Sequence, residues 1–106
     1  MTEIQDLSDA LRKFAEDRDW HKFHTPENLA KSISIEAGEL LELFQWDRVQ
    51  TNDPAPEMAD ILIYLVMMAD VMGIDLVAAT WVKIASNAAR YPIEKAKGNC
   101  KKAEEL

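Results

Sequence analysis

The sequence predicts an all-α fold, a bundle of four helices in a single domain that spans residues 1–106. Three observations support this prediction. Apolar residues recur at intervals of three and four along most of the chain, and no segment shows the alternation of apolar and polar residues that is typical of a strand. The chain contains only three glycines and four prolines. Its 106 residues accommodate about four helices of average length.

The first helix is expected over residues 3–19. Its apolar residues stand at helical spacing: Ile4, Leu7, Leu11 and Phe14. Thr2 precedes them and is a suitable N-cap, because its hydroxyl can accept a hydrogen bond from a free backbone N–H of the first helical turn. The helical pattern stops at Trp20, so residues 20–24 are expected to form a turn.

Thr25 and Pro26 mark the start of a second helix, since an N-cap threonine followed by proline at the first helical position is a typical helix beginning. The helix should extend to about Phe44. Its apolar stripe comprises Leu29, Ile33, Leu40 and Leu43. Residues 45–56 contain the turn-forming sequence Asn52-Asp53-Pro54 and are expected to form an exposed loop.

The third helix is expected over residues 55–72. Between residues 61 and 68 it is apolar nearly all round. A helix of this kind is usually covered on most sides, so we expect it to be the central element of the fold. Gly73 suits the position after the last helical residue, where glycine readily adopts a left-handed conformation.

The fourth helix is expected to begin after Asp75, whose carboxylate can cap it, and to end near Pro92. The remaining residues, 93–106, are rich in charge and have no clear apolar stripe. We therefore expect them to form a loose tail. The connections between the four helices are short, which is typical of a bundle.

The formal net charge of −7 argues against binding to DNA or RNA polymers, because proteins that bind a polyphosphate backbone usually carry a face rich in lysine and arginine. A single nucleotide is compatible with this charge. Metal ions held by carboxylates can convert an acidic pocket into a phosphate-binding site. A small domain also gains stability from a bound metal or a partner subunit.

Cysteine content and apolar run length bear on the location of the protein. Cys100 is the only cysteine, so no disulfide can form within the chain, and a free surface thiol is expected. Residues 1–6 lack the basic and apolar blocks of a signal peptide. The longest apolar run, residues 61–69, is far shorter than the roughly 20 residues needed to span a bilayer. We expect a cytoplasmic protein that has no membrane partner.

Two acidic pairs are the strongest candidates for a functional site. Glu36 and Glu39 are three residues apart on the second helix, so they project from one side of it. Glu57 and Asp60 have the same spacing on the third helix. A single pair of this kind is common on solvated surfaces. Here both pairs lie on or beside apolar stripes, where carboxylates must be protonated, paired with bases or bound to cations, and a metal is the simplest solution.

The expected ligand atoms are all oxygens, which favours Mg²⁺, with Mn²⁺ as a substitute. Mg²⁺ commonly binds a few carboxylates together with substrate phosphates. A di-iron carboxylate bundle is the competing enzyme class, but it usually has Glu-x-x-His pairs, and neither acidic pair here is of that type. His21 and His24 are three apart in a turn, where polar or aromatic packing is more common than metal binding. Glu42 adds a third acid at the same interval and is expected to support the ligands without binding the metal.

Basic and aromatic residues extend the phosphate hypothesis. One face of the fourth helix and its end present groups suited to phosphate oxygens: Lys83, Asn87, Arg90 and Tyr91. A solvated helix face would have the same pattern. Three aromatic residues stand at helix ends, where they could either stack on a base or cap the core: Trp20, Phe23 and Trp46.

The amino-acid sequences of these motifs are similar to those of a known family. Three segments carry the resemblance: 36–46 (EAGELLELFQW), 57–64 (EMADILIY) and 87–92 (NAARYP). They resemble the MazG-like all-α nucleoside triphosphate pyrophosphohydrolases, and within them the dCTP pyrophosphatase branch. The family pattern is Glu-x-x-Glu, a spacer and Glu-x-x-Asp, and the similarity extends from Arg18 to Pro92.

The resemblance implies a role for each group of residues. The metal ligands would be Glu36, Glu39, Glu57 and Asp60. The base and sugar would be framed by Trp20, Phe23, His24, Trp46 and Tyr64. The phosphates would be held by Lys83, Asn87, Arg90 and Tyr91. Family members assemble as dimers or dimers of dimers, so a homodimer or homotetramer, with the bundle completed by a second subunit, is also implied.

The implied reaction is hydrolysis of a nucleoside triphosphate, with the deoxy form preferred, to the monophosphate and pyrophosphate. dCTP is the first expected substrate and dATP the second, and the expected cellular purpose is removal of surplus or non-standard nucleotides. Mg²⁺ held by the four acids would neutralise phosphate charge, and Glu39 is expected to orient or deprotonate the attacking water. The alternatives from other classes are a non-catalytic nucleotide-binding module and a helical interaction module.

Overall fold

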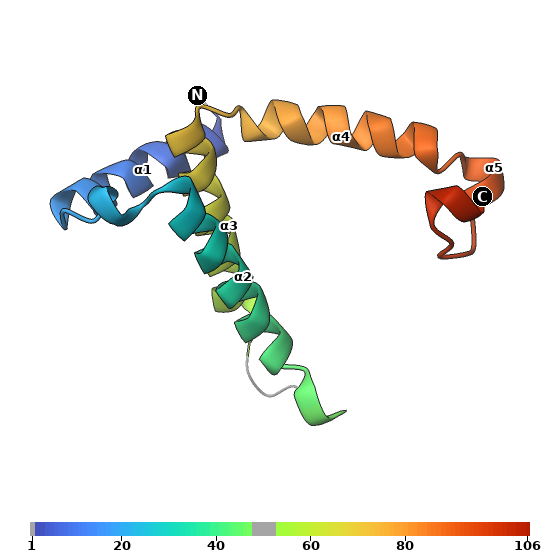
Figure 1. Cartoon of the computed structure of the whole chain (residues 1–106), viewed down its shortest axis with the longest axis horizontal. Coiled ribbons are helices and arrows are strands. Elements are labelled where there is room, and N and C mark those ends of the chain that lie inside the picture. The colour runs from blue at the N-terminus through green and yellow to red at the C-terminus, as the bar shows by residue number, and fades with distance from the viewer. Residues whose placement is uncertain (1, 48–52) are drawn as a thin grey trace. The chain divides into compact units, whose positions relative to one another are not determined.

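The computed structural model describes residues 2–47 and 53–106. Its α-helices are α1 (Glu3–Asp17), α2 (Pro26–Glu42), α3 (Ala55–Met72), α4 (Leu76–Arg90) and α5 (Ile93–Ala96) (Figure 1). Three short 3-10 helices are η1 (His21–Phe23), η2 (Gln45–Asp47) and η3 (Ala103–Glu105). The described residues contain no strand, so the predicted all-α class is confirmed. Part of the loop predicted over residues 45–56 lies outside the described residues.

The chain divides into two units, Met1–Ile74 and Asp75–Leu106. The first unit contains α1, α2 and α3, and the second contains α4, α5 and η3. The single domain expected over residues 1–106 stays a prediction. The stretch 93–106, for which the sequence predicts a loose tail, contains α5 and η3, two short helical segments closed by local backbone hydrogen bonds.

Local capping positions the helices. Side-chain oxygens at three helix starts accept backbone N–H groups: Thr2 from Gln5 at 3.1 Å, Thr25 from Asn28 at 3.2 Å and Asp75 from Ala78 at 3.0 Å. Gly73 ends α3 with a φ of 66°, a left-handed conformation that glycine adopts without steric cost. All four features agree with the sequence prediction.

Two helices end earlier than the sequence predicts. α1 ends at Asp17 instead of near residue 19, because Asp19 has a φ of 56° and cannot continue a right-handed helix. α2 ends at Glu42 instead of near Phe44. The N–H groups of residues 43 and 44 bond to carbonyls only three residues back, which tightens the last turn into 3-10 geometry.

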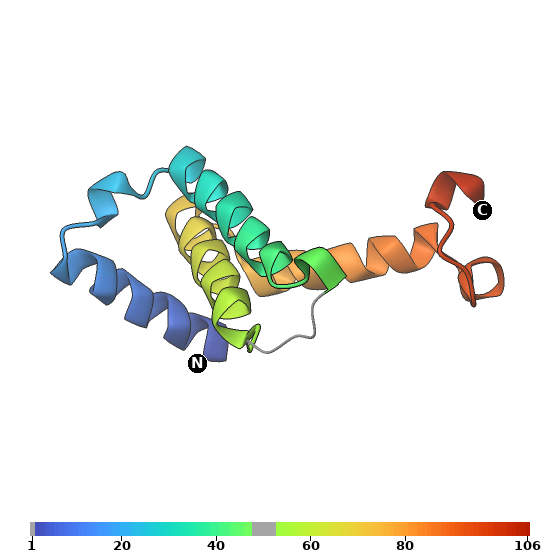
Figure 2. The same cartoon turned by 90° about the horizontal axis from the view of Figure 1, so that it is seen from below.

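The core of the first unit lies where α2 packs along α3 and α1 crosses α3. Both views show α2 and α3 side by side (Figures 1 and 2). Five side chains are buried there: Ala15, Leu29, Val66, Met67 and Ala69. Leu29 is 1% exposed and is the largest fully buried side chain in the part of the chain that the structure describes. Burial of the apolar faces of α2 and α3 therefore brings these two helices into contact.

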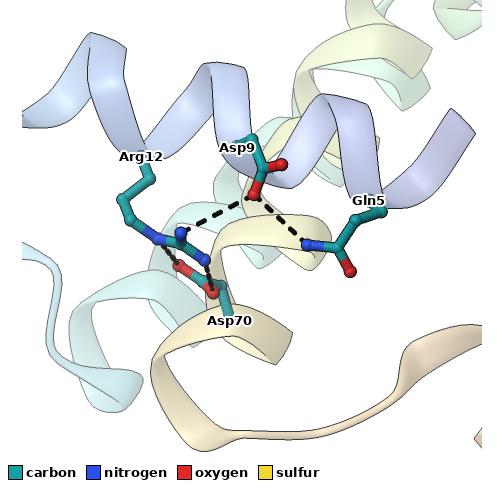
Figure 3. Close-up of polar contacts among 4 residues, drawn as sticks. All are labelled: Gln5, Asp9, Arg12 and Asp70. Carbon is teal, nitrogen blue, oxygen red and sulfur yellow. Dashed lines mark hydrogen bonds and ion pairs between the residues drawn. The ribbon is translucent and has the colours of Figure 1, made fainter. Parts of the chain in front are cut away.

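An ion pair fastens α1 to the C-terminal end of α3. The guanidinium of Arg12 donates two hydrogen bonds to the carboxylate of Asp70, at 2.6 and 3.1 Å (Figure 3). Asp9 lies 3.6 Å from the same guanidinium and accepts a hydrogen bond from the Gln5 side chain at 3.2 Å. A two-pronged contact of this kind sets the orientation of the two helices as well as their distance.

α3 is less covered than the sequence predicts. Val66, Met67 and Ala69 are buried, but Met58 and Leu62 are 57% and 41% exposed. Within the first unit, among the described residues, α2 and α1 are the helices that pack extensively against α3, and they leave these two apolar side chains uncovered. Among the described residues, no single helix is both long and apolar enough to cross a membrane.

Leu29 provides a test of the packing between α2 and α3. Leu29→Ala should lower the free energy of unfolding by about 2–4 kcal/mol, because it removes buried methyl groups and leaves a cavity. Urea denaturation would measure the change. Lys31→Ala, on the exposed side of the same helix, should cost less than about 0.5 kcal/mol. Equal losses in the two variants would contradict the assigned core.

Candidate metal centre

Four carboxylates meet between α2 and α3. Glu36 and Glu39 stand one helical turn apart on α2, and Glu57 and Asp60 stand one turn apart at the start of α3. Because the two helices pack side by side, the pairs face each other. One oxygen atom from each of the four side chains lies within 4.8 Å of the other three. The structure thus brings together the four acids that the sequence singles out.

Two oxygen atoms of this cluster are buried without a partner. The Oε2 atoms of Glu36 and Glu57 are inaccessible to solvent and accept no hydrogen bond. Glu36, Glu57 and Asp60 are partly buried, while Glu39 is exposed. No ion pair between described residues involves these four acids. A buried carboxylate oxygen without a donor is costly, and a cation would satisfy it.

The surroundings favour the protonated form of two of the acids. Burial is the largest cause that raises the pKa of Glu36 from 4.5 to about 7, followed by hydrogen bonding with Glu39 and the negative charges of Glu39, Asp60 and Glu57. Burial and Glu39 also raise the pKa of Glu57, with smaller contributions from the charges of Asp60 and Glu42. Without a cation, both shifts favour a proton on the cluster at a pH where an ordinary carboxylate has lost it.

The donor set suits a hard divalent cation. The four side chains offer only carboxylate oxygens, which Mg²⁺ and Mn²⁺ accept readily. The orphaned Oε2 atoms and the raised pKa values indicate a site that lacks positive charge. His21 and His24 do not join this set, because they precede α2 and Glu36 lies ten residues after its first residue, about 15 Å along the helix. The Glu-x-x-His pairs of a di-iron site are absent from the sequence.

The expected base and sugar contacts fall into two places in one chain. Phe23 is the last residue of η1, and Trp20 and His24 flank η1 before the N-terminus of α2. Trp46 follows α2, is 74% exposed and has a φ of 71°. Tyr64 is partly buried on α3, one turn after Asp60. The structure therefore places Trp46 and Tyr64 towards the acidic end of the α2 and α3 pair, and the other three at the opposite end of α2.

The expected phosphate contacts all belong to the second unit. Lys83, Asn87 and Arg90 are exposed on α4, and Tyr91 follows its last residue. The backbone carbonyl of Asn87 accepts a hydrogen bond from the N–H of Tyr91 at 2.9 Å. The Arg90 guanidinium lies 5.6 Å from the centre of the Tyr91 ring. Their role in holding phosphates stays a prediction.

Sequence reasoning missed two residues that shape the turn around η1. Asp19 adopts a left-handed conformation, and the Asn28 side chain donates a hydrogen bond to the carbonyl of Phe23 at 2.9 Å. The residue types could have indicated these roles, because aspartate and asparagine tolerate positive φ and their side chains often form hydrogen bonds with nearby backbone groups. Their spacing alone does not distinguish this role from that of ordinary surface residues.

Comparison with known proteins gives consistent matches. The MazG-like family model matches residues 31–106. Curated dCTP pyrophosphatase 1 from Bos taurus is 36% identical, over 97% of this chain and 68% of that protein. The Homo sapiens dCTP pyrophosphatase 1 is also 36% identical, over 97% of this chain and 67% of its own length. The crystal structure of a pyrophosphatase from Archaeoglobus fulgidus superimposes with a TM-score of 0.80 at 41% identity, covering 87% of this chain and 94% of that one.

These matches confirm the resemblance drawn from the three sequence motifs. The matched range 31–106 includes all four acids of the cluster as well as α4. The expected enzyme class, a pyrophosphohydrolase, agrees with the names of the relatives. Since the family model covers most of the chain and the relatives align over nearly all of it, the chain belongs to the MazG-like family.

Proposed function

We propose that this protein hydrolyses deoxynucleoside triphosphates to the monophosphate and pyrophosphate at a divalent cation held by Glu36, Glu39, Glu57 and Asp60. The observation that supports it most directly is the cluster itself. One oxygen of each of the four carboxylates lies within 4.8 Å of the other three, and two oxygens of the cluster are buried without a hydrogen-bond partner. Mg²⁺ is the proposed ion, with Mn²⁺ as a substitute, and when bound it supplies positive charge to the triphosphate and acidifies water.

The four acids are proposed to have unequal roles. Glu36, Glu57 and Asp60 are partly buried, so they are suited to hold the cation. Glu39 is exposed and within reach of solvent, so it is our candidate for orienting the attacking water or accepting its proton. Glu42 is exposed and its charge acts on Glu57, which fits a supporting role outside the ligand set.

The proposed substrate is dCTP, with dATP second. The name shared by the mammalian relatives, dCTP pyrophosphatase 1, supports this order. Exposed aromatic rings at Trp20, Phe23 and Trp46 are available to stack on a base. We propose removal of surplus or non-standard nucleotides from the cytoplasmic precursor pool as the purpose. The phosphates are proposed to be contacted by Lys83, Asn87 and Arg90 of α4 and by Tyr91, which follows it.

The reaction products test this proposal. With Mg²⁺, the purified protein should convert dCTP to dCMP and pyrophosphate in equal amounts, faster than other dNTPs, as separated by ion-exchange chromatography. Orthophosphate as the sole inorganic product, or no turnover of any nucleotide, would exclude the proposed reaction. Tight binding without turnover would instead favour a non-catalytic nucleotide-binding module.

Substitutions within the cluster test the site. Glu57→Gln and Asp60→Asn should each lower kcat/KM by at least about 100-fold, because each removes a charged ligand, while circular dichroism remains close to that of the wild type. Glu27→Gln is the matched control, since it makes the same chemical change on α2 outside the cluster. If both cluster variants retain activity, the metal site does not lie at this cluster.

The raised pKa of Glu36 predicts how the stability of the metal-free protein varies with pH. The group titrates near 4.5 when unperturbed and near 7 in the fold. Between these values the folded state binds more protons than the unfolded state, so the free energy of unfolding should fall as the pH rises from about 5 to about 8. Mg²⁺ should reverse most of this loss, because it binds the charged carboxylates.

Thermal melts with EDTA or with Mg²⁺, at several pH values, would measure this dependence. Glu36→Gln has no titrating group at this position and should weaken the pH dependence of the EDTA samples, with the raised pKa of Glu57 accounting for what remains. A melting temperature that rises between about pH 5 and about pH 8 in EDTA would contradict the pKa assigned to Glu36.

We also propose that the active form is a homo-oligomer, a dimer or a dimer of dimers. α1 and α2 leave Met58 and Leu62 of α3 uncovered, and we propose that a second subunit covers them. The turn 20–24 lies about 15 Å along α2 from Glu36, and we propose that the turn of a second copy supplies the base contacts beside the acids.

Light scattering coupled to gel filtration tests the assembly. The mass should be at least twice the 12.0 kDa of one chain. Leu62→Glu should dissociate the assembly and reduce kcat/KM, because it places a charge on the exposed apolar side of α3. Lys13→Glu, on the exposed side of α1, is the control for a change of charge. A fully active monomer would exclude the proposal.

A further inference from the structure

The turn around η1 presents two large aromatic side chains to solvent. Trp20 is 46% exposed and Phe23 is 58% exposed. A cavity of about 60 Å³ lies where the turn meets α1 and α3, lined by His21 and His24 of the turn, by residues of α1 and by Met67 of α3. Since the side chains are exposed and a cavity lies beside the turn, burial contributes little to its conformation.

The start of the turn is anchored to α1. The left-handed conformation of Asp19 reverses the chain, and the N–H of Trp20 then donates a hydrogen bond to the carbonyl of Ala15 at 2.9 Å. The Trp20 ring meets the Phe14 ring edge to face, with centres 5.8 Å apart. The Arg18 guanidinium lies 3.7 Å from the centre of the Phe14 ring. Trp20 thus has a defined position relative to α1.

The end of the turn is anchored to α2 by one side chain. Asn28 stands at the third position of α2, and its Nδ2 donates to the carbonyl of Phe23 at 2.9 Å. Its own backbone N–H donates to the hydroxyl of Thr25, so the residue that ties down the turn is itself fixed by the helix cap. Within the turn, the N–H groups of Phe23 and His24 donate to carbonyls three residues back.

From these contacts we infer that Asn28 is a positioning residue, which holds Phe23 and His24 in the arrangement that receives the nucleotide base. The inference rests on the proposed function, since that function assigns the base contact to this turn. Asn28 acts through the backbone carbonyl of Phe23 and does not touch substrate. Its loss should therefore weaken nucleotide binding while leaving the acids between α2 and α3 in place.

Asn28→Asp separates this role from helix stability. Aspartate has the same size but lacks the N–H donor, and its carboxylate repels the Phe23 carbonyl. A negative charge in the first turn favours the helix, so α2 should remain as stable as before. Asn28→Ala also removes the donor but adds no charge. In both variants KM for dCTP should rise about fivefold with kcat changed less than about twofold, and amide exchange at Phe23 and His24 should accelerate.

Thr2→Ala controls for destabilisation, because it removes the N-cap of α1 far from the turn and should change neither KM nor the exchange of those two amides. Unchanged exchange in both Asn28 variants overturns the inference, as does faster exchange with an unchanged KM. If KM rises in Asn28→Asp but not in Asn28→Ala, the added charge is the cause, and the inference is overturned as well. If the wild-type protein hydrolyses no nucleotide, the proposed function fails, whereas the exchange rates still decide whether Asn28 holds the turn.

Discussion

Mutual repulsion among four carboxylates is the constraint around which α2 and α3 are arranged. Glu36, Glu39, Glu57 and Asp60 lie close enough to repel one another, and two of their oxygens have no donor. The protein offsets this cost elsewhere, through the buried contacts of Leu29 and its neighbours and through the ion pair that fastens α1 to α3. The cluster is therefore expected to bind a proton or a cation, since either one relieves the repulsion between the carboxylates.

The same arrangement explains how a small helical domain can act on a highly charged substrate. A net charge of −7 repels an approaching triphosphate. A divalent cation held by the acidic cluster would neutralise the carboxylate charge at that point and remove the repulsion there. Most of the other acids whose burial the structure describes are exposed and do not share this environment. Membership of the MazG-like family and the relation to dCTP pyrophosphatases agree with a role for the cluster in pyrophosphate chemistry.

The two ends of α2 carry different parts of the proposed site. Its C-terminal half bears two of the acids, whereas the turn before its N-terminus bears exposed aromatic rings held by Asn28 and by contacts with α1. A rigid helix keeps these parts about 15 Å apart in one chain. We propose that a second copy completes the site by covering the side of α3 that α1 and α2 leave uncovered. Placement of the turn thus becomes as important for the proposed function as placement of the acids.

Local chemistry made much of this protein predictable from its sequence. The caps at Thr2, Thr25 and Asp75 act within three residues, and the spacing of the acids places each pair on one side of its helix whatever the rest of the chain does. The position of the acids beside apolar stripes also predicted the burial that raises the pKa of Glu36, whereas contacts between residues distant in sequence, such as Arg12 with Asp70, could not be predicted. The tertiary structure alone decided how closely the two acidic pairs approach, that α1 and α2 leave Met58 and Leu62 uncovered, and that the aromatic turn lies far from the acids along α2, because each depends on how separate helices pack.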